Sequence, residues 1–144
     1  MQNHHGDIFR KEFKKTCAQH GLKITHQRIA IYEELLKTED HPSADVIFNR
    51  IKKVFPHISF DTVYRTLTSF SEMGLIKLVE GYGEKKRFDS NTENHHHLRC
   101  IKCNVIIDFY NQSYDKISVP RALKKDFEVL NKKVVLEGIC KNCK

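Results

Sequence analysis

Four of the five cysteines in this 144-residue chain form two pairs with the same internal spacing. Two residues separate Cys100 from Cys103, and two separate Cys140 from Cys143 at the end of the chain. Two thiolates at this spacing can hold one divalent ion, and two such pairs supply the four ligands of a closed zinc site. Disulfides and unpaired core cysteines are the alternatives, but we see no secretory segment and therefore expect reduced thiols and a structural Zn(II) ion. The ion would tie the C-terminal tail to the middle of the chain.

The composition is that of a soluble, basic protein. The formal net charge is +7, and 40% of the residues are hydrophobic. No apolar run reaches the length of a membrane span, and the first residues lack the basic and apolar parts of a signal peptide, so we expect a cytoplasmic protein without membrane contacts. The excess of lysine and arginine favours a polyanionic partner, because counterion release rewards each cation placed against a phosphate. Charge alone does not distinguish nucleic-acid binding from an ordinary basic surface.

The first part of the chain reads as three amphipathic helices. Apolar residues recur every four positions over residues 8–20, and Gly21 ends this pattern. Thr25 and Ser43 are typical N-cap residues, so each is expected to begin a further helix. The third helix is expected to point four side chains inward, namely Ile47, Ile51, Val54 and Phe55.

The fourth predicted helix begins after a break at residues 56–58 and ends at Gly74. One of its faces is apolar, and the other carries polar side chains on successive turns. A two-faced helix after a break is what a helix-turn-helix motif needs to read the DNA major groove, and a merely solvated face is the alternative. The residues expected to contact DNA are Ser59, Asp61, Thr62, Tyr64, Arg65 and Thr68.

A β-hairpin is predicted directly after this helix. Residues 75–80 and 84–88 read as strands, and residues 81–83, with two glycines, read as the turn. A hairpin in this position makes a winged helix, and basic residues near its tip can lie along phosphates without reading bases. The expected phosphate contacts are Lys85, Lys86 and Arg87.

The rest of the chain alternates between strands and a helix. Residues 105–109 read as a strand, a helix begins near residues 118–120, and residues 127–130 and 134–136 read as two more strands. This order predicts a small α/β domain with an exposed sheet, which is a common dimerisation surface.

Together these elements predict an α+β fold with two domains. We expect an N-terminal winged helix-turn-helix domain over residues 1–88, which binds double-stranded operator DNA. A C-terminal α/β dimerisation domain over residues 89–144 is expected to contain the four-cysteine zinc site and to form a homodimer.

Five segments carry a resemblance to a known family. They are HPSAD at 41–45, DTVYR at 61–65, RFD at 87–89, HHHLRCIKC at 95–103 and VIIDF at 105–109. Over nearly its whole length the chain resembles the ferric-uptake-regulator family of bacterial metal-responsive repressors, and it looks most like the peroxide-sensing branch.

The resemblance implies a second, regulatory metal site with five ligands, which are His41, Asp89, His95, His97 and Asp108. Alternate residues of an extended segment point to one side, so two imidazoles of the triple histidine can act together while His96 faces away. Nitrogen and carboxylate donors suit Fe(II) or Mn(II), whereas four sulfurs suit zinc. A single histidine or aspartate in a loop is most often only solvated, so the prediction depends on the whole pattern.

The resemblance to the peroxide-sensing branch further implies how the signal is read. Bound Fe(II) reacts with hydrogen peroxide, the oxidant modifies a ligand histidine, His41 or His95 by position, and the metal then leaves and repression ends. We choose this branch because the chain has aspartate at positions 89 and 108, where the iron-sensing branch tends to carry glutamate.

Three alternatives remain open from the sequence. An iron-level sensor of the same fold is the nearest, since Arg65 is the residue that the iron branch carries. A metallohydrolase would need an open coordination position and a general base, and no spare carboxylate is placed for that role, so we expect neither catalysis nor a small-molecule substrate. A purely structural zinc protein would leave the second ligand set without a role.

The resemblance also bears on a third metal site. The family's auxiliary metal site draws a histidine from near residues 131–133, and this chain has no histidine there. We therefore expect no third metal site.

Overall fold

The computed structural model describes residues 3–79 and 85–144, with side chains from Gly6 onward. The chain divides into two compact units, Met1–Thr92 and Glu93–Lys144. The junction expected from the sequence lay after residue 88, whereas the strand that carries Asp89 belongs to the first unit. Helices and sheets are combined as the predicted α+β fold requires, and each unit is described by itself.

Four helices make up most of the first unit, namely α1 Asn3–Gln19, α2 His26–Leu36, α3 Ala44–Ile51 and α4 Phe60–Glu72. The side chains of Thr25 and Ser59 each accept a hydrogen bond from a backbone N–H in the first turn of α2 and α4. Gly21 and Gly74 follow α1 and α4 with φ angles of +67° and +77°, which glycine adopts readily. In the described part of the chain no helix is both long enough and apolar enough to cross a membrane.

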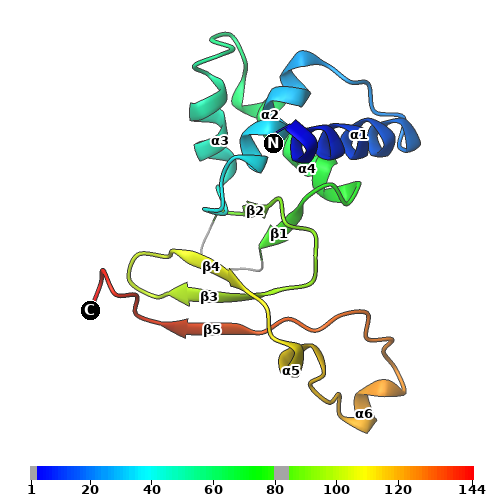
Figure 1. Ribbon diagram of the computed structural model, residues 1–144, viewed down its shortest axis with the longest axis vertical. Coiled ribbons are helices and arrows are strands. Elements are labelled where there is room, and N and C mark those ends of the chain that lie inside the picture. Colours follow the sequence, from blue (N-terminus) through cyan, green and yellow to red (C-terminus); the bar gives the residue numbers. More distant parts are fainter. Residues whose placement is uncertain (1–2, 80–84) are drawn as a thin grey trace. The chain divides into compact units, whose positions relative to one another are not determined.

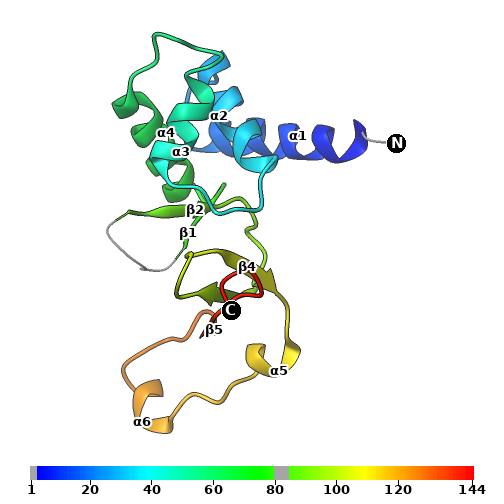
Figure 2. The ribbon, with the colours of Figure 1, turned by 90° about the vertical axis from the view of Figure 1, so that its left-hand side faces the viewer.

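An aromatic cluster joins three of these helices. Phe70 of α4 is fully buried and meets Phe13 of α1 and Tyr32 of α2 edge-on, at ring-centroid distances of 5.6 and 5.9 Å. Phe13 and Tyr32 stack on each other at 4.8 Å. Figure 2 shows the N-terminal end of α1 extending beyond the other three helices. The apolar stripes read from the sequence therefore form one shared core.

The prediction for the third helix was partly wrong. Ile47 and Ile51 are buried and Phe55 packs against the core, but Val54 is 67% exposed. The helix ends at Ile51, so the helical spacing that would have turned Val54 inward is lost in the turns that follow. Ser43 precedes α3 in an extended conformation and makes no side-chain capping bond.

The predicted wing follows α4. Strand β1 is Lys77–Val79 and strand β2 is Arg87–Asp89, and they pair antiparallel with Leu78 opposite Phe88. Phe88 is buried and joins the core beneath the helices. The turn expected at residues 81–83 lies outside the described residues.

The second unit is built on a three-stranded sheet. Its strands are β3 His96–Cys100, β4 Ile106–Phe109 and β5 Val135–Gly138. Strand β3 lies between the other two, antiparallel to β4 and parallel to β5, as Figure 1 shows. The long connection from β4 to β5 holds two single-turn helices, α5 Gln112–Asp115 and α6 Arg121–Lys124.

The strand expected at residues 127–130 is absent, and this prediction was wrong. These residues pair with no strand of the described sheet, and Phe127 and Leu130 are 71% and 85% exposed. Phe127 and Val129 are residue types that favour a strand, but a strand also needs a neighbour to satisfy its backbone. In the described sheet, these residues pair with neither β4 nor β5, the two edge strands.

Truncating the aromatic cluster tests this account of the core. We expect Phe70→Ala to lower the free energy of unfolding by about 3–5 kcal/mol, because it leaves a cavity between α1, α2 and α4. Val54→Ala is the matched control and should change it by less than about 0.5 kcal/mol, since this side chain is exposed. Urea unfolding followed by circular dichroism measures both, and equal effects of the two substitutions would contradict the packing described.

Candidate metal centres

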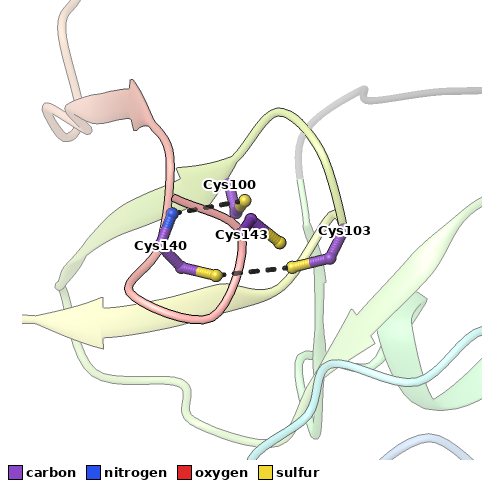
Figure 3. Close-up of side chains that lie close together, drawn as sticks. All are labelled: Cys100, Cys103, Cys140 and Cys143. Atoms are coloured by element: carbon purple, nitrogen blue, oxygen red, sulfur yellow. Dashed lines mark hydrogen bonds between the residues drawn. The ribbon is translucent and has the colours of Figure 1, made fainter.

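The two cysteine pairs are brought together by the sheet of the second unit. Cys100 ends β3 and Cys103 lies in the turn that follows. Parallel pairing places Cys100 opposite Gly138 at the end of β5, and Cys140 and Cys143 lie in the turn directly after it. In Figure 3 the four sulfur atoms point toward one another from these two turns.

The spacing of the sulfur atoms fits a tetrahedral zinc site. All four lie within 4.8 Å of one another, and the sulfurs of Cys103 and Cys140 are 3.8 Å apart. Zn–S bonds of about 2.3 Å give a tetrahedron whose edges are about 3.8 Å long. A disulfide needs a separation of about 2.05 Å, and all five cysteines are free thiols. The four-cysteine group therefore has the geometry of a Zn(II) site.

Two of these thiols have pKa values that are shifted in opposite directions. The backbone N–H of Cys140 donates to the sulfur of Cys100 at 3.4 Å and, with the amides of Cys103 and Lys102, lowers the pKa of the Cys100 thiol to about 6. The sulfurs of Cys140 and Cys103 raise the pKa of the Cys143 thiol to about 12. Four thiolates this close repel one another, so full deprotonation of the group requires a bound cation.

A second group of donors lies on the same sheet, on the face opposite to Leu98. His97 pairs directly with Asp108 across β3 and β4, and His95 precedes β3 by one residue. The Nε2 atoms of the two histidines are 3.0 Å apart, and the Asp108 Oδ1 atom lies 3.3 Å from His95 and 3.1 Å from His97. Neighbouring ligands around an ion with bonds of about 2.1 Å are roughly 3 Å apart. Two imidazoles and a carboxylate therefore form one face of a coordination shell that suits Fe(II) or Mn(II).

Hydrogen bonds assign different roles to the neighbouring histidines. Nδ1 of His95 is 2.7 Å from the carbonyl of Glu93 and donates to it, which leaves the Nε2 lone pair available to a metal. On the other face, Nδ1 of His96 accepts from the N–H of Val134 at 3.0 Å, and its Nε2 donates to Asp115 at 2.8 Å. His96 faces away from His95 and His97, as predicted, and it is fully buried. Sequence reasoning missed Glu93, which acts through a backbone carbonyl, and Asp115, which is 19 residues from His96.

The first unit contributes two further predicted ligands. His41 lies in the loop between α2 and α3, and its Nε2 is 3.3 Å from Oδ2 of Asp89 in β2. Both side chains are buried. The backbone of His41 has a φ angle of +50°, in the left-handed region, where a residue other than glycine costs of order 1–3 kcal/mol. Strain of this size persists only where surrounding contacts hold the loop in place.

The polar side chains of α4 are accessible on its outer face. Asp61 and Arg65 are exposed and form an ion pair one turn apart at 2.8 Å. The hydroxyl of Thr68 donates to the carbonyl of Tyr64 at 2.9 Å. Ser59 and Thr62 are exposed at the helix start, where their hydroxyls are hydrogen-bonded at 2.8 Å. All six residues expected to face DNA therefore lie on or directly before this helix.

The basic residues of the wing differ in their surroundings. Lys85 and Lys86 are exposed, and the Lys85 ammonium is 3.1 Å from Asp45 of α3. Arg87 is only partly exposed, and its guanidinium donates to backbone carbonyls inside the unit.

Comparison with known proteins agrees with this arrangement. The family model described as the ferric uptake regulator family matches residues 19–137. A peroxide-responsive repressor of Staphylococcus epidermidis is 37% identical over 124 residues, which cover 86% of this chain and 83% of that protein.

Solved structures show the same fold. The ferric uptake regulator of Vibrio cholerae superposes with a TM-score of 0.70 at 29% identity, covering 88% of this chain and 98% of that one. The peroxide stress regulator of Campylobacter jejuni superposes with a TM-score of 0.65 at 27% identity, covering 95% and 97%. The family model spans both units and the curated relative matches most of the sequence, and this chain therefore belongs to the ferric uptake regulator family.

Proposed function

We propose that this protein is a metal-dependent transcriptional repressor that senses hydrogen peroxide. The observation that carries the proposal is the group formed by His95, His97 and Asp108, whose nitrogen and oxygen donors are 3.0–3.3 Å apart and separate from the thiols. A protein with only a structural zinc ion has no use for this second set. Similarity to a peroxide-responsive repressor supports the choice of signal.

The two donor sets hold different metals in this proposal. Zn(II) binds Cys100, Cys103, Cys140 and Cys143 and stabilises the second unit. Fe(II) or Mn(II) binds the regulatory site, whose five ligands are His41, Asp89, His95, His97 and Asp108. An Fe(II) ion held there would supply the electron for reductive cleavage of hydrogen peroxide, and His41 or His95 would be the ligand that becomes oxidised.

Sharing one ion among these five ligands links the metal to DNA binding. Two of the ligands belong to the first unit and three to the second, so an ion held by all five fixes the angle between the units. An oxidised imidazole is a poor ligand, so the metal leaves. The angle between the units is then no longer fixed. Metal occupancy then shifts the population of the DNA-binding form only as far as the ion prefers that form.

The surfaces of the two units support binding to DNA as a homodimer. The exposed polar face of α4 fits the major groove, with Lys85, Lys86 and Arg87 expected along the phosphates. On the sheet, Leu98 pairs with Ile107 and Leu136, and these side chains are 42%, 50% and 40% exposed. A second copy of the chain would cover this apolar row. A repressor of this kind acts on chromosomal DNA in the cytoplasm and needs no catalytic turnover of a substrate.

An iron-level sensor is the second candidate, favoured by Arg65 on the exposed face of α4. The two candidates differ in what releases the operator. Peroxide releases it irreversibly in the first case, while removal of Fe(II) by a chelator releases it reversibly in both. The metallohydrolase alternative predicts metal-dependent turnover of a substrate and no specific DNA binding.

The zinc assignment predicts a selective effect of cysteine substitution. We expect purified protein to carry one equivalent of zinc, and Cys103→Ser to lose it and to unfold the second unit, because a site with three thiolates binds more weakly. Cys17→Ala is the control, since this cysteine is buried in the helical core. Elemental analysis and hydrogen exchange measure the result, and full zinc content in Cys103→Ser would rule out the site.

Metal-dependent repression predicts that operator binding requires the regulatory ligands. With a duplex selected from a random-sequence pool in the presence of Mn(II), we expect Mn(II) to raise DNA affinity at least about tenfold, and His97→Ala to remove that increase. His57→Ala, at an exposed position, should leave it unchanged. Fluorescence anisotropy gives the affinities, and stimulation that survives His97→Ala would refute the ligand assignment.

Peroxide sensing predicts a specific chemical change. Protein loaded with Fe(II) without oxygen and treated with stoichiometric hydrogen peroxide should gain one oxygen atom on the peptide that contains His41 or His95, as measured by mass spectrometry. Protein loaded with Mn(II), and Fe(II) protein without peroxide, should remain unmodified. Unmodified histidines together with retained DNA binding after peroxide would favour the iron-level sensor.

A further inference from the structure

Strand β2 lies along the loop that carries His41. Arg87, its first residue, forms an isolated antiparallel bridge with Ser43. The N–H of Phe88 donates to the carbonyl of the residue after His41 at 3.0 Å. The carboxylate of Asp89 is the third contact, 3.3 Å from the imidazole of His41. Each residue of the strand thus contacts one short loop.

The side chain of Arg87 makes the most specific of these contacts. Its Nε donates to the carbonyl oxygen of His41 at 2.6 Å, and its Nη2 donates to the carbonyl oxygen of Asp40 at 2.8 Å. A guanidinium presents several N–H donors in one rigid plane, so it can hold two successive carbonyls at once. A lysine ammonium is a point charge without that fixed geometry.

These two hydrogen bonds fix the backbone of His41. The carbonyl of Asp40 belongs to the peptide plane before His41, and the carbonyl of His41 belongs to the plane after it. Holding both planes sets both backbone dihedral angles between them. One of these is the φ of +50°, which an extended loop would not adopt. This backbone conformation sets the direction of the Cα–Cβ bond of His41, from which the imidazole reaches Asp89.

We propose that Arg87 is a positioning residue for the regulatory metal. Its guanidinium holds the peptide planes on both sides of His41, so that this imidazole lies beside Asp89 before an ion binds. The inference rests on the proposed function, because it takes His41 and Asp89 as ligands. It also gives Arg87 a main role different from the phosphate contact expected from its place in the wing.

Substitution of Arg87 tests this role. We expect Arg87→Ala to weaken Mn(II) binding about tenfold or more, as loss of a group that orients a metal ligand does. Arg87→Lys should fall between this variant and the wild type, because an ammonium can hold only part of the arrangement. Free Mn(II) measured by electron paramagnetic resonance gives the affinities. Thermal unfolding of the metal-free variants shows that they remain folded.

Lys86→Ala is the matched control, since Lys86 is the exposed neighbour of Arg87 in the same wing. It should leave Mn(II) affinity unchanged and lower the salt dependence of DNA binding by about one unit of slope. If Arg87→Ala behaves like Lys86→Ala, with normal Mn(II) affinity and a reduced salt slope, then Arg87 is a phosphate contact and the inference is overturned.

A double-mutant cycle separates positioning from general weakening of the fold. If Arg87 acts through His41, Arg87→Ala should have no further effect on Mn(II) affinity once His41 is replaced by alanine. An equal loss in both backgrounds overturns the positioning role. His41→Ala alone distinguishes the two levels of the proposal, since normal Mn(II) binding in that variant would remove His41, and with it the five-ligand assignment, from the proposed function.

Discussion

The register of β3 within its sheet is the constraint on which both candidate metal centres depend. Pairing with β4 sets His97 beside Asp108, and parallel pairing with β5 brings the second cysteine pair to Cys100. Because side chains alternate between the two faces of a strand, a slip of one residue would turn His96 toward Asp108 and carry Cys100 away from the other thiols. One strand register therefore decides two donor sets.

Metal binding and the stability of the second unit are linked by its small core. Among the described residues of this unit, only Cys100 and Ile106 are buried hydrophobic residues. A unit of this size buries too little apolar surface to be stable by packing alone, and a structural metal is a common remedy. The thiols repel one another when ionised, so zinc both removes that repulsion and cross-links the two turns.

In the first unit, one strand belongs both to the wing predicted to contact DNA and to the proposed regulatory metal site. Strand β2 forms half of the wing, and it also carries Asp89 and holds the loop of His41. Any movement of this strand therefore changes the surroundings of His41 and Asp89, the two proposed ligands. The helical core beneath it, through Phe88, gives the strand a rigid support.

The amino-acid sequence by itself determined the four helices of the first unit, the caps at Thr25 and Ser59, and the two strands of the wing, because local spacing and residue type carry that information. It also showed that alternate histidines act together and that His96 turns away. Tertiary structure alone decided that residues 127–130 form no strand, that Val54 is exposed and that the guanidinium of Arg87 faces His41. These outcomes depend on which segments pair in space, and pairing partners far apart in the chain leave no local pattern in the sequence.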